Sequence, residues 1–159
     1  MDENQKATMT DSTPPNFRHH IRVPIRYADL DTLGHVNNAS YLAYTEQARI
    51  TYVRDLGIWD GYLSPLGLIV ARICTDYKMA LRLEDEAVDV WTRISRLGNK
   101  SFTIEYLLNR AGDHATAATS EIVIVAYDYE NDQTIVIPDD WRAKIIAYEP
   151  ALTSNSGDQ

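Results

Sequence analysis

Cysteine is nearly absent from this chain of 159 residues, which has only Cys74. A single thiol excludes an internal disulfide framework and is typical of a protein from a reducing compartment. The neighbours Ile73 and Thr75 indicate a β-strand. We therefore expect Cys74 to be a packed thiol of the core rather than a nucleophile.

Long hydrophobic runs are also missing. No apolar segment approaches the roughly 20 residues that a membrane-spanning helix needs. Residues 1–16 are polar and lack the apolar centre of a secretory signal. We expect a cytoplasmic protein without a membrane span.

Positive charge is in the minority, because 15 Lys and Arg face 23 Asp and Glu, for a formal net charge of −8. This balance argues against a nucleic-acid partner, which needs clustered cations. The negative net charge does not exclude a small anionic ligand, because such a ligand needs only a local basic patch.

Several familiar kinds of site are missing as well. The sequence has no Gly-rich phosphate loop and no Ser or Cys nucleophile elbow. Its four histidines are scattered, and adjacent strand residues such as His19 and His20 point to opposite faces of a sheet. We therefore predict no metal site.

The hydrophobic pattern predicts one α+β domain over residues 17–149, between disordered tails at 1–16 and 150–159. Alternating apolar residues indicate a first strand over 20–27, where Pro24 suggests an edge or a bulge. Further strands are expected over 67–77, 87–97, 102–108 and 115–129, and a short helix is expected from Pro138.

One long helix is predicted between these strands. Asn37, Asn38 and Ser40 are candidate N-caps, and Gly57 stands where a helix commonly ends. The segment between them has apolar or aromatic residues on more than one side, which indicates a buried helix. An antiparallel sheet wrapped around this helix is the simplest way to bury it.

The junction between the first strand and this helix holds the densest set of reactive groups. It follows the pattern D-x-D-x-x-G-H-V-N-N-x-x-Y-x-x-Y-x-E from Asp29 to Glu46. A carboxylate for chemistry and free N–H groups at a helix start lie within a few residues of each other.

This pattern resembles the signature of hot-dog-fold thioesterases, in particular the acyl-CoA thioesterases related to 4-hydroxybenzoyl-CoA thioesterase. The resemblance extends over roughly residues 18–148. It implies a hot-dog fold that hydrolyses an acyl thioester to a free acid and coenzyme A, with no metal and no cofactor beyond the coenzyme A of the substrate. It also implies a homodimer or homotetramer with active sites between subunits.

Asp31 matches the family's catalytic aspartate and is expected to act as nucleophile or as general base. Backbone N–H groups near Asn38 would stabilise the oxyanion. Gly34 would let the backbone approach the substrate. For Asp29 we expect a turn or capping carboxylate.

His35 has three interpretations and Glu46 has two. His35 could donate to the thioester carbonyl, orient Asp31, or only hold the loop. Plant acyl-carrier thioesterases show a related D-x-N-x-H arrangement, but Leu33 occupies the asparagine position here. Glu46 could position the hydrolytic water or form an ion pair with Arg49.

Substrate contacts are expected in two places. Near the acyl group they are Gly34, Val36, Asn37, Asn38 and Tyr41. For the coenzyme A phosphates, the predicted turn at Asn99, Lys100 and Ser101, with Arg93 and Arg96 beside it, is the candidate. The alternative is that this turn is merely a solvated hairpin.

Other functions are compatible with parts of the pattern. A phosphatase of the haloacid-dehalogenase type shares D-x-D-x-T, but the preceding strand alternates and the chain lacks repeated βαβ units. A hydratase or dehydratase of the same fold, and a non-catalytic acyl-CoA or acyl-carrier binding protein, remain open alternatives.

Overall fold

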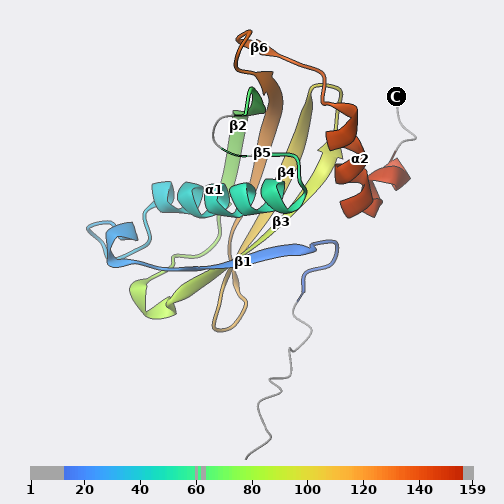
Figure 1. The fold of residues 1–159 in the computed structure, drawn as a ribbon. Coiled ribbons are helices and arrows are strands. Elements are labelled where there is room, and N and C mark those ends of the chain that lie inside the picture. Colours follow the sequence, from blue (N-terminus) through green and yellow to red (C-terminus); the bar gives the residue numbers. More distant parts are fainter. Residues whose placement is uncertain (1–12, 60, 62–63, 156–159) are drawn as a thin grey trace, which may run out of the picture.

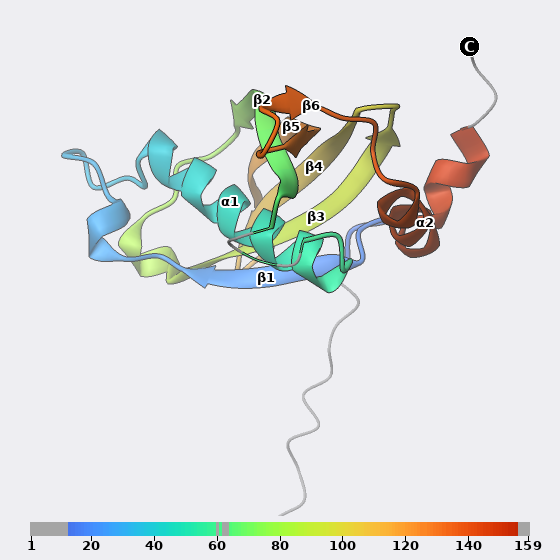
Figure 2. The same ribbon diagram turned by 45° about the horizontal axis from the view of Figure 1, so that its top comes forward.

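An antiparallel sheet curls around one long helix, α1 (Asn38–Asp55), in the computed structural model, which describes residues 13–59, 61 and 64–155 (Figures 1 and 2). The strands lie in the order β1-β3-β4-β5-β2, and a short β6 pairs with β5. The core fills the space between α1 and the inner face of the sheet. This is the predicted α+β hot-dog architecture.

The strands are β1 (His19–Pro24), β2 (Leu66–Tyr77), β3 (Ala87–Leu97), β4 (Ser101–Arg110), β5 (Thr116–Asp128) and β6 (Gln133–Thr134). The other helices are α2 (Asp139–Tyr148) and the 3-10 helices η1 (Tyr27–Asp29), η2 (Leu83–Asp85) and η3 (Pro150–Asn155). None of the helices in the described ranges is long and apolar enough to cross a membrane.

The ends of α1 follow the predicted signals. Asn37 is the N-cap, and its side chain accepts the backbone N–H of Ala39 at 2.9 Å. Gly57 adopts a φ of +70° just beyond the last turn, a conformation that glycine takes without strain. The Asn37 cap thus determines where α1 begins, and Gly57 marks where it ends.

The first strand is shorter than predicted. β1 is an edge strand, as the position of Pro24 suggested, and it ends at that proline. Beyond it the chain turns into η1, because the Asp29 carboxylate accepts the backbone N–H of Arg26 at 2.8 Å. Tyr27, expected on an apolar strand face, is therefore 82% exposed.

The prediction of a helix buried on nearly all sides was wrong for a single chain. Helix α1 packs against β1 and β3, and Tyr44 and Tyr52 on that side are buried. On the other side Leu42 is 36% and Ile50 40% exposed. One sheet of this size covers only part of the helix circumference.

Cys74 also lies on the other face from the one predicted. It is on β2, as expected, but its side chain is exposed. Ile73 and Thr75 pair with Ile122 and Ser120 of β5, and the side chains of neighbouring strand residues point to opposite faces. Cys74 therefore faces outward from the sheet and is not a core thiol.

The tails are only partly within the described ranges. The predicted disordered C-terminal tail begins with η3, so that prediction was wrong for its first six residues. Most of the predicted N-terminal tail, residues 1–12, lies outside the described residues.

Candidate active site

A cavity of about 420 Å³ lies at the N-terminal end of α1. Three segments line it: the loop before α1, the first turn of α1 and the end of β2 with the residues that follow. The lining residues are Asp31, His35, Val36, Asn38, Tyr41, Tyr77, Lys78, Met79 and Ala80. The first five were predicted as site residues from the sequence, whereas the last four were not.

The Asp31 carboxylate is held at the cavity by its own loop. Its Oδ1 atom accepts the backbone N–H groups of Leu33 at 2.8 Å and His35 at 3.1 Å. Its backbone N–H donates to the carbonyl of His35 at 2.7 Å, and Gly34 turns the chain with a φ of +77°. Oδ2 has no hydrogen-bond partner in the described ranges, so one oxygen is anchored and the other is available for chemistry.

One backbone N–H at the start of α1 is also available. From Leu33 to Ser40, all of whose residues the structure describes, each backbone N–H has an acceptor except that of Asn38. Asn38 lines the same cavity as Asp31. A free N–H at a helix N-terminus is suited to stabilise negative charge on a bound oxygen.

The neighbouring carboxylate, Asp29, is part of the support of this loop. Its side chain is buried and accepts hydrogen bonds from the Tyr44 hydroxyl at 2.9 Å and from Arg26. Its backbone carbonyl accepts from the Asn37 N–H and the Ser40 hydroxyl. Asp29 thus has the structural role predicted for it.

His35 holds the loop through its backbone, and its imidazole lines the cavity. The ring forms no hydrogen bond or ion pair within the described ranges. The imidazole therefore makes no hydrogen bond that orients Asp31. A donor role toward the thioester carbonyl and a loop-holding role both agree with the geometry, because the second needs only the main chain.

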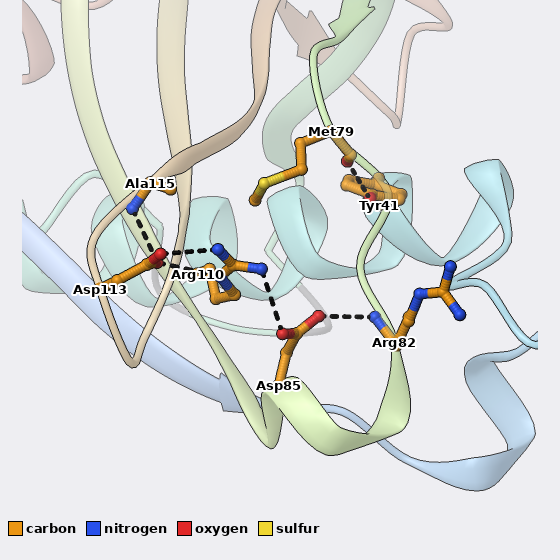
Figure 3. Close-up of polar contacts among 7 residues, drawn as sticks. All are labelled: Tyr41, Met79, Arg82, Asp85, Arg110, Asp113 and Ala115. Atoms are coloured by element: carbon orange, nitrogen blue, oxygen red, sulfur yellow. Dashed lines mark hydrogen bonds and ion pairs between the residues drawn. The ribbon is translucent and has the colours of Figure 1, made fainter.

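Two tyrosines form the wall opposite the loop. The rings of Tyr41 and Tyr77 meet edge to face, with centroids 5.1 Å apart. The Tyr41 hydroxyl donates to the carbonyl of Met79 at 3.4 Å (Figure 3), and the Tyr77 hydroxyl donates to that of Asn38 at 3.3 Å. These contacts join the end of β2 to the start of α1.

Comparison with known proteins agrees with this geometry. The sequence profile of the thioesterase-like superfamily matches residues 25–145. The chain belongs to this superfamily. It is a thioester hydrolase, as the pattern around Asp31 predicted.

Individual relatives have related names and the same fold. The acyl-CoA thioesterase YbgC of Haemophilus influenzae is 30% identical over 106 residues, which are 65% of this chain and 77% of that protein. A thioesterase from Thermus thermophilus, crystallised with coenzyme A and zinc, is 32% identical with a TM-score of 0.75. That match covers 86% of this chain and 98% of the Thermus chain.

The structure does not bring Glu46 of the thioesterase to this cavity. Glu46 lies two helical turns beyond Asn38, about 12 Å along the axis. Its side chain is 61% exposed, 3.5 Å from Arg49, beside a separate hollow of about 400 Å³ between β1 and α1. This location agrees with the ion-pair interpretation and offers no contact with Asp31.

The predicted coenzyme A turn at Asn99, Lys100 and Ser101 lies at the far end of the sheet. Strand β3 starts at Ala87, which pairs with Pro24 at the end of β1 that leads into the Asp31 loop, and it reaches this turn ten residues later, about 33 Å measured along the strand. The turn is packed beside α2, where Arg142 donates to the carbonyl of Gly98. Within one copy of the thioesterase, these three residues do not line the Asp31 cavity.

No cluster of metal-ligating side chains is present in the part of the chain that the structure describes. The cavity supplies one carboxylate, one imidazole and one ammonium group, and the ammonium group is no metal ligand at neutral pH.

Proposed function

We propose that this thioesterase hydrolyses acyl-CoA in the cavity at the N-terminus of α1. The observation that carries the proposal is that one cavity is lined by Asp31, whose Oδ2 has no partner in the described ranges, and by Asn38, whose backbone N–H has none there either. Thioester hydrolysis needs these two functions, a group that attacks or activates water and a donor for the oxyanion.

In the proposed reaction the thioester carbonyl oxygen accepts the Asn38 N–H. Asp31 Oδ2 then attacks the carbonyl carbon directly or takes a proton from an attacking water. The carbon–sulfur bond then breaks, and the sulfur leaves as a thiolate that is protonated to the thiol by a proton that comes from water. In the direct route a water hydrolyses the mixed anhydride formed with Asp31, whereas in the general-base route the attacking water supplies the oxygen of the free acid. The two hydrogen bonds on Oδ1 keep the carboxylate oriented in either route.

The coenzyme A part of the proposal is supported by YbgC, named as an acyl-CoA thioesterase, and by the Thermus protein bound to coenzyme A. No cofactor or metal is required beyond the coenzyme A of the substrate. The single cysteine supports a cytoplasmic location.

We also infer that the active form is a homo-oligomer. Strand β2 is an edge of the sheet and has one unpaired side in the described region. Its inner face exposes Val70, Ile73 and Tyr77, which a second copy could cover. Across such an interface, Lys100 of one copy could contact a substrate bound in the Asp31 cavity of the other copy.

The first test is thiol release from short, long and aromatic acyl-CoA substrates by wild type and Asp31→Asn. Asparagine keeps the acceptor for the Leu33 and His35 N–H groups but removes the charge. We expect turnover to fall by about 100- to 10,000-fold, the range for loss of an acid–base group, with the circular dichroism spectrum unchanged.

The matched control is Asp139→Asn, which removes an equal charge at the exposed start of α2. It should keep wild-type turnover. Equal activity of wild type and Asp31→Asn would refute the role of Asp31. Thermal stabilisation by acyl-CoA without any turnover would favour a binding protein instead.

A further inference from the structure

Most basic side chains of this chain already have partners. Fourteen Lys and Arg lie in the described ranges, and seven of them form ion pairs, namely Arg22, Arg26, Arg49, Arg72, Arg93, Arg110 and Lys144. Arg18 and Arg142 donate to backbone carbonyls. The side chains of the remaining five form no ion pair there, and these five are Arg54, Lys78, Arg82, Arg96 and Lys100.

Two of these five cations lie on the segment that follows β2, and one of them lines the Asp31 cavity. Lys78 lines the cavity, directly after the last residue of β2. Arg82 lies four residues further, next to Leu81, whose carbonyl accepts the Val36 N–H of the catalytic loop at 2.8 Å. Both side chains are exposed.

The backbone that carries these two cations is held at several points. The Tyr41 hydroxyl donates to the Met79 carbonyl, and the Asp85 carboxylate accepts the Arg82 backbone N–H at 2.7 Å (Figure 3). Asp85 also pairs with Arg110, which forms a second pair with Asp113. The segment is thereby fixed to both α1 and the turn between β4 and β5.

The same network leaves the Arg82 charge unneutralised. Asp85 gives one oxygen to the backbone of Arg82 and the other to Arg110. In Figure 3 the Arg82 guanidinium points away from Asp85, and no contact joins it to the other residues drawn. In a chain with a formal net charge of −8, an unpaired cation that lines the cavity and a second one four residues further on the same segment create a local site for an anion.

We propose that Lys78 and Arg82 bind a phosphate group on the thiol side of the substrate while the thioester lies at Asp31. The inference rests on the function proposed above and names the chemistry that the site selects, a phosphopantetheine thioester. The phosphate can come from the nucleotide end of coenzyme A or from the phosphodiester that links phosphopantetheine to a carrier protein. Charge-assisted hydrogen bonds to phosphate are the interaction that both side chains can make.

The test compares three thioesters of the same acyl group. Acyl-CoA carries the nucleotide phosphates, acyl-4′-phosphopantetheine carries one phosphate, and acyl-N-acetylcysteamine carries none. The double variant Lys78→Gln/Arg82→Gln should raise KM for acyl-CoA by about 10- to 100-fold, the effect of losing one or two charge-assisted hydrogen bonds. It should leave kcat for acyl-CoA, and kcat/KM for acyl-N-acetylcysteamine, at wild-type values.

The matched control is Arg54→Gln, which removes an unpaired cation in the last turn of α1, the end away from Asp31. It should keep the wild-type KM for every substrate. Rising salt should raise the KM of the wild type for acyl-CoA and have a smaller effect on the double variant, because screening weakens only charges that are present.

The phosphorylated substrates distinguish the two phosphate sources. An equal rise in KM for acyl-CoA and acyl-4′-phosphopantetheine would assign the site to the phosphate that carrier proteins share. A rise for acyl-CoA alone would assign it to the nucleotide end. Either result supports the proposal.

An unchanged KM for acyl-CoA in the double variant would overturn the phosphate site, and so would an equal loss on acyl-N-acetylcysteamine. Absence of wild-type turnover on all three thioesters would refute the proposed hydrolysis instead. In that case calorimetric titration with coenzyme A still tests the cations, because binding should weaken in the double variant and persist in Arg54→Gln.

Discussion

Asp29 and Asp31 stand two residues apart on one loop, yet only Asp31 lines the cavity. The Asp29 side chain is 6% exposed, and its carboxylate accepts hydrogen bonds from Arg26 and Tyr44. Asp31 keeps one oxygen free because its loop satisfies only the other. Hydrogen bonding therefore makes Asp29 a supporting carboxylate and leaves Asp31 with one unpartnered oxygen.

At this residue scale we predict that Asp29→Asn destabilises the protein. Burial disfavours the charged carboxylate, but hydrogen bonds from Arg26 and Tyr44 outweigh it and lower the pKa of Asp29 below its ordinary value of 3.8. Loss of these charge-assisted contacts should reduce the free energy of unfolding by about 1–3 kcal/mol. Urea denaturation of wild type and Asp29→Asn at pH 7 measures this reduction.

The pH dependence supplies a control for this prediction. With a lowered pKa, the stabilisation by Asp29 is complete above the ordinary value of 3.8 and disappears as pH falls through the lower, folded-state pKa. The gap between wild type and Asp29→Asn should thus shrink in strong acid. A difference in the free energy of unfolding that stays constant until Asp29 is fully protonated would contradict this explanation. Asp31→Asn serves as the control and should have nearly the free energy of unfolding of the wild type.

At the scale of elements, α2 is attached to the core by a buried carboxylate. Glu149, just after α2, accepts the Tyr52 hydroxyl of α1 and the Ile94 N–H of β3. Burial raises the pKa of Glu149 above its ordinary value of 4.5, although these hydrogen bonds and the nearby Arg18 and Arg93 lower it in part. The Glu149 carboxylate thus connects α2 to α1 and β3, but its charge is buried.

We predict that Glu149→Gln removes a pH dependence of stability. Because the folded-state pKa is raised, the folded protein holds this proton more tightly than the unfolded chain. The stability from Glu149 is therefore full below pH 4.5 and declines as pH rises through the raised pKa. Urea denaturation between pH 4 and pH 8 should show this decline in wild type.

The exposed Glu130→Gln is the control for that series and should follow wild type. Glu149→Gln should gain stability relative to wild type as pH rises. If the free energies of unfolding of wild type and Glu149→Gln differ by the same amount at every pH, the buried-charge explanation is contradicted.

At the scale of the whole molecule, the sheet leaves one side of α1 and the inner face of β2 uncovered (Figure 2). The exposed apolar residues there lie on the same side as the catalytic cavity, where Tyr77 belongs to both. Association of two copies would bury this surface and complete the surroundings of the cavity.

We therefore expect an oligomer in solution that Ile73→Asp converts toward a monomer. Ile73 is 43% exposed, so a charge there should be tolerated by the fold but costly in an interface. Light scattering coupled to size exclusion measures the mass. Val136→Asp, a similarly exposed position between β6 and α2, should keep the wild-type mass, and a monomeric wild type would refute the interface.

The sequence alone determined the features that depend on near neighbours in the chain. The alternating apolar residues predicted both end residues of β3 correctly. The Asn37 cap and Gly57 predicted both ends of α1. The conformation of the Asp31 loop also depends on near neighbours, because the groups that hold Asp31 come from one short segment. Local hydrogen bonds and side-chain periodicity act over a few residues, so they can be recognised in sequence.

Only the tertiary structure decided the features that depend on distant segments. Tyr77, Lys78, Met79 and Ala80 join the site because β2 ends beside the start of α1, which no pattern in residues 77–80 indicates. The outward position of Cys74, the distance of Lys100 from the cavity and the uncovered side of α1 likewise follow from strand order and register. These are set by the packing of segments far apart in sequence, and burial of a side chain depends on that packing rather than on its neighbours in the chain.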